Sequence, residues 1–166
     1  AGLKLINTDA KIGISALKKS TNSKAEHFSA TDVAFQICPR INAAGRMDTA
    51  NLAVDLLTCE DNEIAEYKAE QLNLENTHRH EVEEKIDKDI AEIMANDRAY
   101  QTDRVIVVAG HNYHKGVIGI CAAHLVELYS KPAIVIGIDD EGNATGSARS
   151  IDGFNIFEAI SSCSDI

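Results

Sequence analysis

Three short segments of the sequence carry side chains suited to binding an anion. The first is residues 39–47, Pro-Arg-Ile-Asn-Ala-Ala-Gly-Arg-Met. Its proline and glycine predict an irregular loop between two helices. Arginine presents a planar fork of N–H donors that matches a phosphate, so Arg40 and Arg46 are candidate ligands. Asn42 adds a further donor between them.

The second segment is residues 110–117, Gly-His-Asn-Tyr-His-Lys-Gly-Val, between an expected buried strand and the start of a helix. Free amides at a helix N-terminus attract anions, which favours a phosphate site here. The segment is not a P-loop, because its lysine precedes the final glycine and no serine or threonine follows. His111 and His114 could ligate a metal ion, but no third ligand is in view, so we expect no metal.

The third segment is residues 146–150, Gly-Ser-Ala-Arg-Ser, at the end of an expected strand. Ser147 and Arg149 are two positions apart, so they point to the same face of a strand and can converge on one anion. Gly146 would allow a ligand or another backbone to approach closely.

Each segment also has a purely structural interpretation. Residues 39–47 could end a helix whose arginines lie on the surface or pair with Asp48 and Asp55. Residues 110–117 could be a polar loop, and residues 146–150 an edge strand with ordinary polar side chains. The spacing of these residues leaves the alternatives open.

The first half of the chain predicts short helices. Apolar spacing predicts helices within 2–20, the second starting at Asp9, and then a loop over 21–29. A helix from Thr31 ends at Pro39, and another helix opens at Asp48 and Thr49.

The second half of the chain predicts an alternation of strand and helix. The later elements are strand 104–108, helix 116–129, strands 133–138 and 144–150, and a helix beginning at residue 154. This order is typical of a small α/β domain with a mixed sheet.

Residues 61–97 contain no proline or glycine and predict one helix of about 50 Å. Such a length suits a connector, so we expect three parts: residues 1–60, a connector over 61–98 and an α/β domain over 99–166. The net charge of the chain is −10, and residues 61–103 hold 13 acidic and 5 basic residues. The acidic charge is thus a solvated helix face, which excludes a broad basic DNA-binding face but leaves room for a few focused arginines.

The four cysteines are too far apart for metal-binding pairs, and no secretory segment opens the chain, which indicates a reducing cytoplasm. No apolar run approaches the length of a membrane span. The chain lacks an initiator methionine, and we expect it to be a piece of a longer protein.

Four motifs acquire a joint meaning from their order: residues 39–47, His-Lys-Gly-Val-Ile-Gly-Ile at 114–120, Lys131-Pro132 before a buried strand, and Gly-Ser-Ala-Arg-Ser at 146–150 followed by Gly153-Phe154. With a long acidic helix after the first motif, this pattern resembles the RecJ family of single-strand-specific 5′-to-3′ DNA exonucleases in the DHH phosphoesterase superfamily. The resemblance covers nearly the whole chain.

The resemblance implies the helical tail of a DHH domain over residues 1–60, the connector helix, and a C-terminally incomplete DHHA1 domain over 99–166. The intact enzyme would act in DNA repair and recombination, hydrolysing phosphodiesters with two Mn²⁺ or Mg²⁺ ions held by residues outside this chain. We therefore expect no bound metal, no catalytic residue and no nuclease activity in the chain alone.

The implied partner is single-stranded DNA carrying a 5′-phosphate, with repair proteins as further partners and no membrane. The implied ligands are Ser147, Arg149 and Gly146 on the DHHA1 side and Arg46 with Asn42 on the DHH side, while Arg40 and His114 are weaker candidates. Two alternatives remain: a nanoRNase or nucleotide phosphatase of the same superfamily, and a non-catalytic interaction module in which the arginines are structural.

Overall fold

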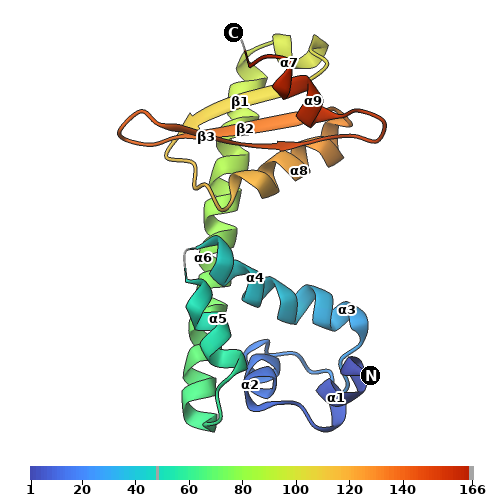
Figure 1. Ribbon diagram of the computed structural model, residues 1–166, viewed down its shortest axis with the longest axis vertical. Helices are drawn as coiled ribbons and strands as arrows, with labels where there is room; N and C mark the ends of the chain where they lie inside the picture. Colours follow the sequence, from blue (N-terminus) through green and yellow to red (C-terminus); the bar gives the residue numbers. More distant parts are fainter. Residues whose placement is uncertain (48, 165–166) are drawn as a thin grey trace. The chain divides into compact units, whose positions relative to one another are not determined.

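The computed structural model describes residues 1–47 and 49–164 and divides into two compact units (Figure 1). The N-terminal unit is residues 1–80, and the C-terminal unit begins at residue 81. The N-terminal unit contains α1 (Gly2–Thr8), α2 (Ile12–Ser20), α3 (Ala30–Asp32), a π-helix (Val33–Ile37), α4 (Cys38–Arg46) and α5 (Ala50–Leu57). The helix α6 (Asn62–Asn96) contributes its first half to this unit and its second half to the other.

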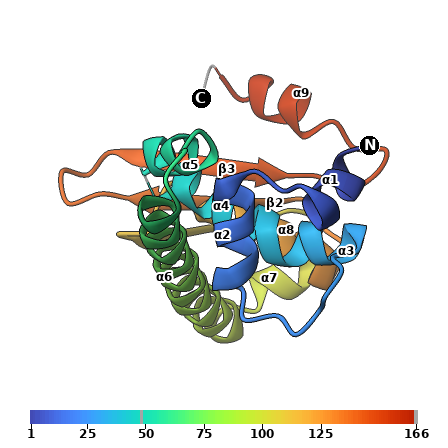
Figure 2. The ribbon, with the colours of Figure 1, turned by 90° about the horizontal axis from the view of Figure 1, so that it is seen from below.

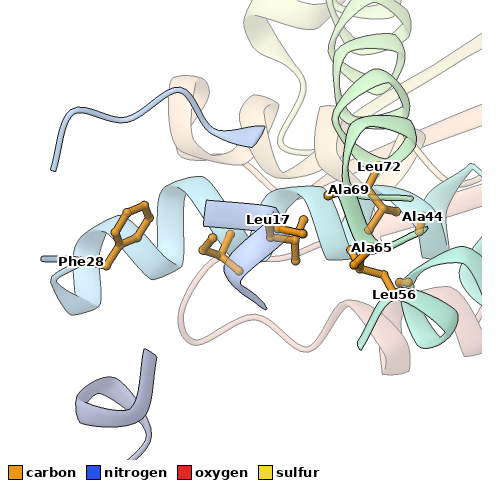
Figure 3. Close-up of a cluster of buried hydrophobic side chains, with 10 residues drawn as sticks. Leu17, Phe28, Ala44, Leu56, Ala65, Ala69 and Leu72 are labelled. Carbon is orange, nitrogen blue, oxygen red and sulfur yellow. The ribbon is translucent and has the colours of Figure 1, made fainter. Parts of the chain in front are cut away.

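The core of the N-terminal unit is a cluster of aliphatic side chains and one phenylalanine (Figure 3). Ala65, Ala69 and Leu72 follow one another at helical spacing and form the buried stripe of α6 in this unit. Leu17 from α2 and Leu56 from α5 belong to the same cluster and are fully buried. The short helices α2, α4 and α5 lie beside this half of α6 (Figure 2), so the small alanines of the stripe allow close packing.

The segment predicted as an irregular loop at residues 39–47 is helical, and that prediction was wrong. Ser29 caps α3 in a capping box with Asp32, whose N–H lies 3.1 Å from Ser29 Oγ. The π-helix follows and leads directly into α4, with Pro39 in the first turn. A wider π turn relieves the clash that a proline makes with the preceding turn, so Pro39 continues the helix instead of ending it.

Two helix starts differ from the sequence prediction: α3 begins at Ala30 after its cap Ser29 and not at Thr31, and α2 does not begin at Asp9. Asp9 ends α1, and the residue that precedes α2 is Lys11. Thr49 precedes α5, as expected, while Asp48 lies outside the described residues. The long helix is confirmed over Asn62–Asn96, and the Asp61 carboxylate accepts a hydrogen bond of 2.9 Å from the N–H of Ile64 in its first turn. None of the helices that the structure describes is long and apolar enough to cross a membrane.

The C-terminal unit holds a three-stranded mixed sheet in the order β1-β2-β3 (Figure 1). Its elements are α7 (Ala99–Thr102), β1 (Ile106–His111), α8 (Ile118–Tyr129), β2 (Ala133–Ile138), β3 (Ala144–Arg149) and α9 (Ile156–Ser161). β1 and β2 are parallel, and β2 and β3 are antiparallel. The predicted α/β class with a mixed sheet is therefore confirmed.

One face of this sheet is buried against α8 (Figure 1). Ile106 and Val108 of β1 and Ala133 and Val135 of β2 alternate with more exposed residues and form that face. All of them are at most 1% exposed. Strict alternation fixes the register, because a slip of one residue would move every apolar side chain to the other face.

Candidate anion-binding sites

Ser147 and Arg149 continue the α8-facing side of the sheet onto its edge strand. Ser147 pairs directly with Val135, and Arg149 pairs with Ala133. Directly opposed residues on neighbouring strands point to the same face, so both polar side chains extend toward α8. The buried face is thus apolar on β1 and β2 and becomes polar on β3. The register of β2 and β3 places Ser147 and Arg149 on one face of the sheet, as the sequence predicted.

The two side chains meet at the beginning of α8. Arg149 Nη1 lies 3.3 Å from Ser147 Oγ and donates a 2.7 Å hydrogen bond to the carbonyl of Ala148. A methyl group on Gly119 would lie 2.9 Å from Ser147 Oγ and 3.0 Å from Arg149 Nη2. The guanidinium and the hydroxyl therefore rest on the bare backbone of Gly119, in the first turn of the helix.

This arrangement combines three features that favour an anion. Arg149 carries a permanent positive charge and is exposed, while Ser147 is half-buried and supplies a hydroxyl donor. The first turn of α8 adds the positive end of a 12-residue helix dipole. A phosphate fits this chemistry because its oxygens accept several charge-assisted hydrogen bonds at once.

Gly146 has a different position from the one predicted. It pairs with Ile136 and lies on the opposite face of β3 from Ser147. A methyl group there would make only ordinary contacts, the nearest at 3.6 Å from a side-chain carbon of Ile136. The close approach to a backbone that was expected at Gly146 occurs at Gly119 instead.

The loop before α8 uses His114 to organise the start of the helix. His114 Nδ1 accepts a 3.2 Å hydrogen bond from the N–H of Gly116, and its carbonyl accepts from the N–H groups of Val117 and Ile118 at 2.9 and 3.1 Å. His114 thus stabilises the start of the helix. Among the described hydrogen bonds, none joins its ring to Ser147 or Arg149.

Tyr113 fixes the same loop to the sheet. A methyl group on Gly110 would lie 2.1 Å from the Tyr113 ring, and one on Gly137 would lie 2.4 Å from the Tyr113 carbonyl, so both glycines make room for this residue. The Tyr113 hydroxyl donates to the carboxylate of Asp89 in α6. Burial, together with this carboxylate, raises the pKa of Tyr113 well above its ordinary value.

A pocket of about 480 Å³ lies between this loop and the second half of α6. Its lining mixes basic residues, among them Lys85, Lys88 and His111, with the acidic Asp89 and Glu92. Charges of both signs surround it, so its electrostatics do not select an anion.

In the N-terminal unit, the helical conformation of α4 places Asn42 and Arg46 on one face, one turn apart. Asn42 is exposed and Arg46 is half-buried in the last turn. The negative end of the helix dipole favours a cation at that position. Asp55, suggested as a partner of an arginine, forms an ion pair with Lys68, whose Nζ lies 2.9 Å from Asp55 Oδ2. The suggested pairing with Asp48 lies outside the described residues.

Arg40 is held by contacts within the N-terminal unit. Its Nε donates to Asn73 Oδ1 at 3.0 Å and its Nη1 donates to the carbonyl of Gln36 at 2.6 Å. Partial burial lowers the pKa of Arg40, while the charge of Glu70 opposes that shift. The bond to Asn73 joins α4 to α6, so Arg40 has a bracing role that spacing alone did not indicate.

Gly119 is the site residue that sequence reasoning missed. The signal was a glycine inside an otherwise apolar helical run, which costs helix stability unless a close contact requires it. The two residues in contact with it, Ser147 and Arg149, lie on a strand that begins 25 positions later in the sequence. The local sequence around Gly119 therefore does not show why a glycine is needed there.

Replacing Gly119 with alanine should disrupt the anion site and leave the fold intact. The new methyl group meets the ends of the Ser147 and Arg149 side chains, which can move aside, and alanine favours the helix by up to about 1 kcal/mol. We expect weaker phosphate binding with an unchanged or slightly higher melting temperature. Isothermal titration with a 5′-phosphorylated oligonucleotide and thermal unfolding by circular dichroism check both; unchanged affinity would remove Gly119 from the site.

A two-metal centre does not fit the described residues. Within residues 1–47 and 49–164, the group of His, Cys, Asp and Glu side chains close enough to hold an ion is Glu83, Asp87 and His124. Three ligands do not hold two ions, and His111 and His114 are not part of the group. No catalytic step is therefore assigned to a metal in this chain.

Comparison with known proteins identifies relatives for both units. Residues 102–166 match the family model of the DHHA1 domain. The chain is 40% identical to the single-stranded-DNA-specific exonuclease RecJ of Bacillus subtilis over 99% of its length, and 33% identical to RecJ of Haemophilus influenzae over 90%. It spans 21% and 26% of those two proteins, about a fifth to a quarter of their length.

Solved structures give the same result. The crystal structure of RecJ in complex with Mn²⁺ from Thermus thermophilus matches with a TM-score of 0.81 and 29% identity, covering 99% of this chain and 23% of that one. The chain also matches a second structure, exonuclease RecJ bound to manganese, with a TM-score of 0.79, and it covers 38% of the chain in that structure. Both matches extend over helices and sheet alike.

Proposed function

Because the chain belongs to the RecJ family and carries a DHHA1 domain, we propose that it is part of a 5′-to-3′ single-stranded-DNA exonuclease of DNA repair and recombination. In this proposal residues 1–60 are the C-terminal part of a DHH domain, residues 61–98 are the connector, and residues 99–166 belong to the DHHA1 domain. The chain supplies substrate-binding surface to that enzyme.

The observation that carries the proposal is the convergence of Ser147 and Arg149 on Gly119. The pair offers a permanent charge and a hydroxyl donor at a helix N-terminus, without a side chain between ligand and backbone. A terminal phosphate carries more negative charge than an internal phosphodiester, so such a site binds a 5′-phosphorylated end more strongly. Recognition of the end is what an exonuclease needs to begin at one terminus.

Asn42 and Arg46 are proposed as a second contact, to the sugar-phosphate backbone. They share one face of α4, and an arginine with an amide neighbour suits a phosphodiester. Arg40 is the weaker candidate because two of its nitrogens already donate within the N-terminal unit. His114 also remains a weaker candidate, because its ring accepts a hydrogen bond from the N–H of Gly116. Gly146 becomes a weaker candidate, because it lies on the opposite face of β3 from Ser147.

The acidic composition is compatible with this function. The net charge is −10, but a site that engages a few phosphates through focused arginines does not need a basic surface. In the intact enzyme, bound Mn²⁺ or Mg²⁺ ions would activate water for attack on the phosphodiester. This chain's proposed part is to hold the strand end.

The proposal is tested by measuring which oligonucleotides the chain binds. Fluorescence anisotropy should give the tightest binding for a 5′-phosphorylated single strand, weaker binding for the 5′-hydroxyl form, and the weakest for a blunt duplex. Binding that is equally tight for a dinucleotide would favour the nanoRNase or phosphatase alternative. No binding to any of them would favour the interaction module.

The same preparations serve as a control for hydrolysis. We expect no shortening of labelled single strands with Mn²⁺ or Mg²⁺, because a two-metal site needs ligands that the described residues do not assemble. EDTA-sensitive shortening that a mock purification does not show would contradict this expectation.

A further inference from the structure

We propose that Glu83, Asp87 and His124 form a zinc-binding site within the C-terminal unit, separate from the anion-binding residues described above. Glu83 and Asp87 are four residues apart on α6, so they share a face of the helix. His124 comes from α8 and faces them. One ligand atom from each residue lies within 4.8 Å of the other two.

The geometry already brings nitrogen and oxygen donors together. His124 Nδ1 lies 2.9 Å from Asp87 Oδ2, and His124 Nε2 lies 3.5 Å from Glu83 Oε1. Donor atoms bound to one tetrahedral zinc ion are about 3.3 Å apart, since each lies about 2.0–2.1 Å from the metal. Small side-chain rotations would therefore let one ring nitrogen and both carboxylates coordinate one ion.

The donor set selects the kind of ion. Imidazole with carboxylates suits zinc and its transition-metal neighbours, whereas Mg²⁺ prefers oxygen ligands alone. Two carboxylates next to each other repel, and a divalent cation between them removes that repulsion. The Glu83 side chain is only 12% exposed, which reduces screening by water.

The surroundings leave one coordination position for water. The side chains of His124 and Asp87 are 44% and 37% exposed, so the site opens to solvent on their side. On the buried side, Cys121 precedes His124 by about one turn of α8 and is fully buried.

An ion at this position would join α6 to α8. Ile86 and Ile90 of α6 are buried on the same side of the helix, and Leu125 of α8 is buried next to His124. The ion would extend this apolar contact at its polar edge. Ser147 and Arg149 are not among its ligands, so the ion would lie apart from the anion-binding residues.

The test uses the purified chain, stripped with EDTA and then freed of the chelator. Titration with Co²⁺, followed by its visible absorption, should show one equivalent bound, and Zn²⁺ should displace it. Loss of a ligand in His124→Ala or Asp87→Asn should weaken Co²⁺ binding at least about tenfold. Zn²⁺ should also raise the melting temperature of the parent chain and not that of either variant.

Two matched variants serve as controls. Glu84→Gln removes an exposed carboxylate of α6, and His27→Ala removes an exposed imidazole of the other unit; both should bind Co²⁺ like the parent chain. If the parent chain binds no Co²⁺, or if His124→Ala binds it equally well, the three side chains interact only through hydrogen bonds and ion pairs and do not form a metal site. Circular dichroism of the two ligand variants establishes that they are folded.

Discussion

Replacing Arg149 with alanine should weaken binding of a 5′-phosphorylated single strand about ten- to a hundredfold. Loss of a hydrogen bond to a charged group costs roughly 1.5–3 kcal/mol, and Arg149 supplies both the charge and the donor fork at the proposed site. The affinity for the 5′-hydroxyl strand should fall less, because the terminal phosphate is the preferred ligand. Anisotropy titrations with both strands measure the two changes.

Three further variants are needed to interpret that result. Arg149→Lys keeps the charge without the fork and should lie between the parent chain and Arg149→Ala. Arg98→Ala removes an exposed arginine elsewhere in the same unit and should change little. Ser147→Ala should likewise lose more affinity for the 5′-phosphorylated strand than for the 5′-hydroxyl strand. If Arg149→Ala binds both strands as well as the parent chain, Arg149 is not a phosphate ligand; if it only melts earlier, its role is structural.

Replacing Gly13 with alanine should destabilise the N-terminal unit by about 3 kcal/mol or more. A methyl group there would lie 2.1 Å from the carbonyl oxygen of Leu56 and 3.2 Å from the Cα of Leu57. Both are backbone atoms of α5, so no side-chain rotation relieves the clash and the helices α2 and α5 must separate. Urea unfolding followed by circular dichroism measures the loss.

Gly45→Ala is the matched control for that variant. Gly45 is also helical, but a methyl group there would meet nothing within 4 Å. Alanine should therefore stabilise α4 by up to about 1 kcal/mol. If the two variants unfold at the same urea concentration, the contact between α2 and α5 is looser than the structure has it.

The regular elements could be predicted where turn-forming or helix-breaking residues clearly mark their ends. The strand over 133–138 agrees with the structure at both ends, because Lys131-Pro132 precedes it and a turn rich in Asp and Gly follows. The long helix was predicted within one residue at each end because nothing in it breaks helical geometry. β1 begins two residues later than predicted, since a β-branched run shows strand preference but not where pairing starts.

Pro39 shows where local rules were insufficient. Proline ends most helices, but here Cys38 donates its N–H to the carbonyl of Val33, five residues back, and the widened turn accommodates the ring. No residue in Val33–Ile37 marks this hydrogen-bond pattern in advance. The consequence for the site is favourable, because a helix fixes Asn42 and Arg46 on one face and a loop would not.

The candidate site was predictable within one strand but not across elements. The two-residue period was enough to put Ser147 and Arg149 on a common face. It could not show that α8 returns to that face, because the packing depends on the crossover between β1 and β2. Arg40 is similar: its partner Asn73 is 33 residues away, so the bracing bond is a tertiary contact without a local signature.

The π-helix at Val33–Ile37 has a consequence for how this family's sequences can diverge. A π turn accommodates one more residue than an α turn, so it acts as a single-residue insertion within a helix. Each residue turns an α-helix by about 100°, so deleting one residue there would rotate Asn42 and Arg46 away from their present direction by about that angle. A relative that retains both side chains but lacks the inserted residue would present them to a different side of the helix.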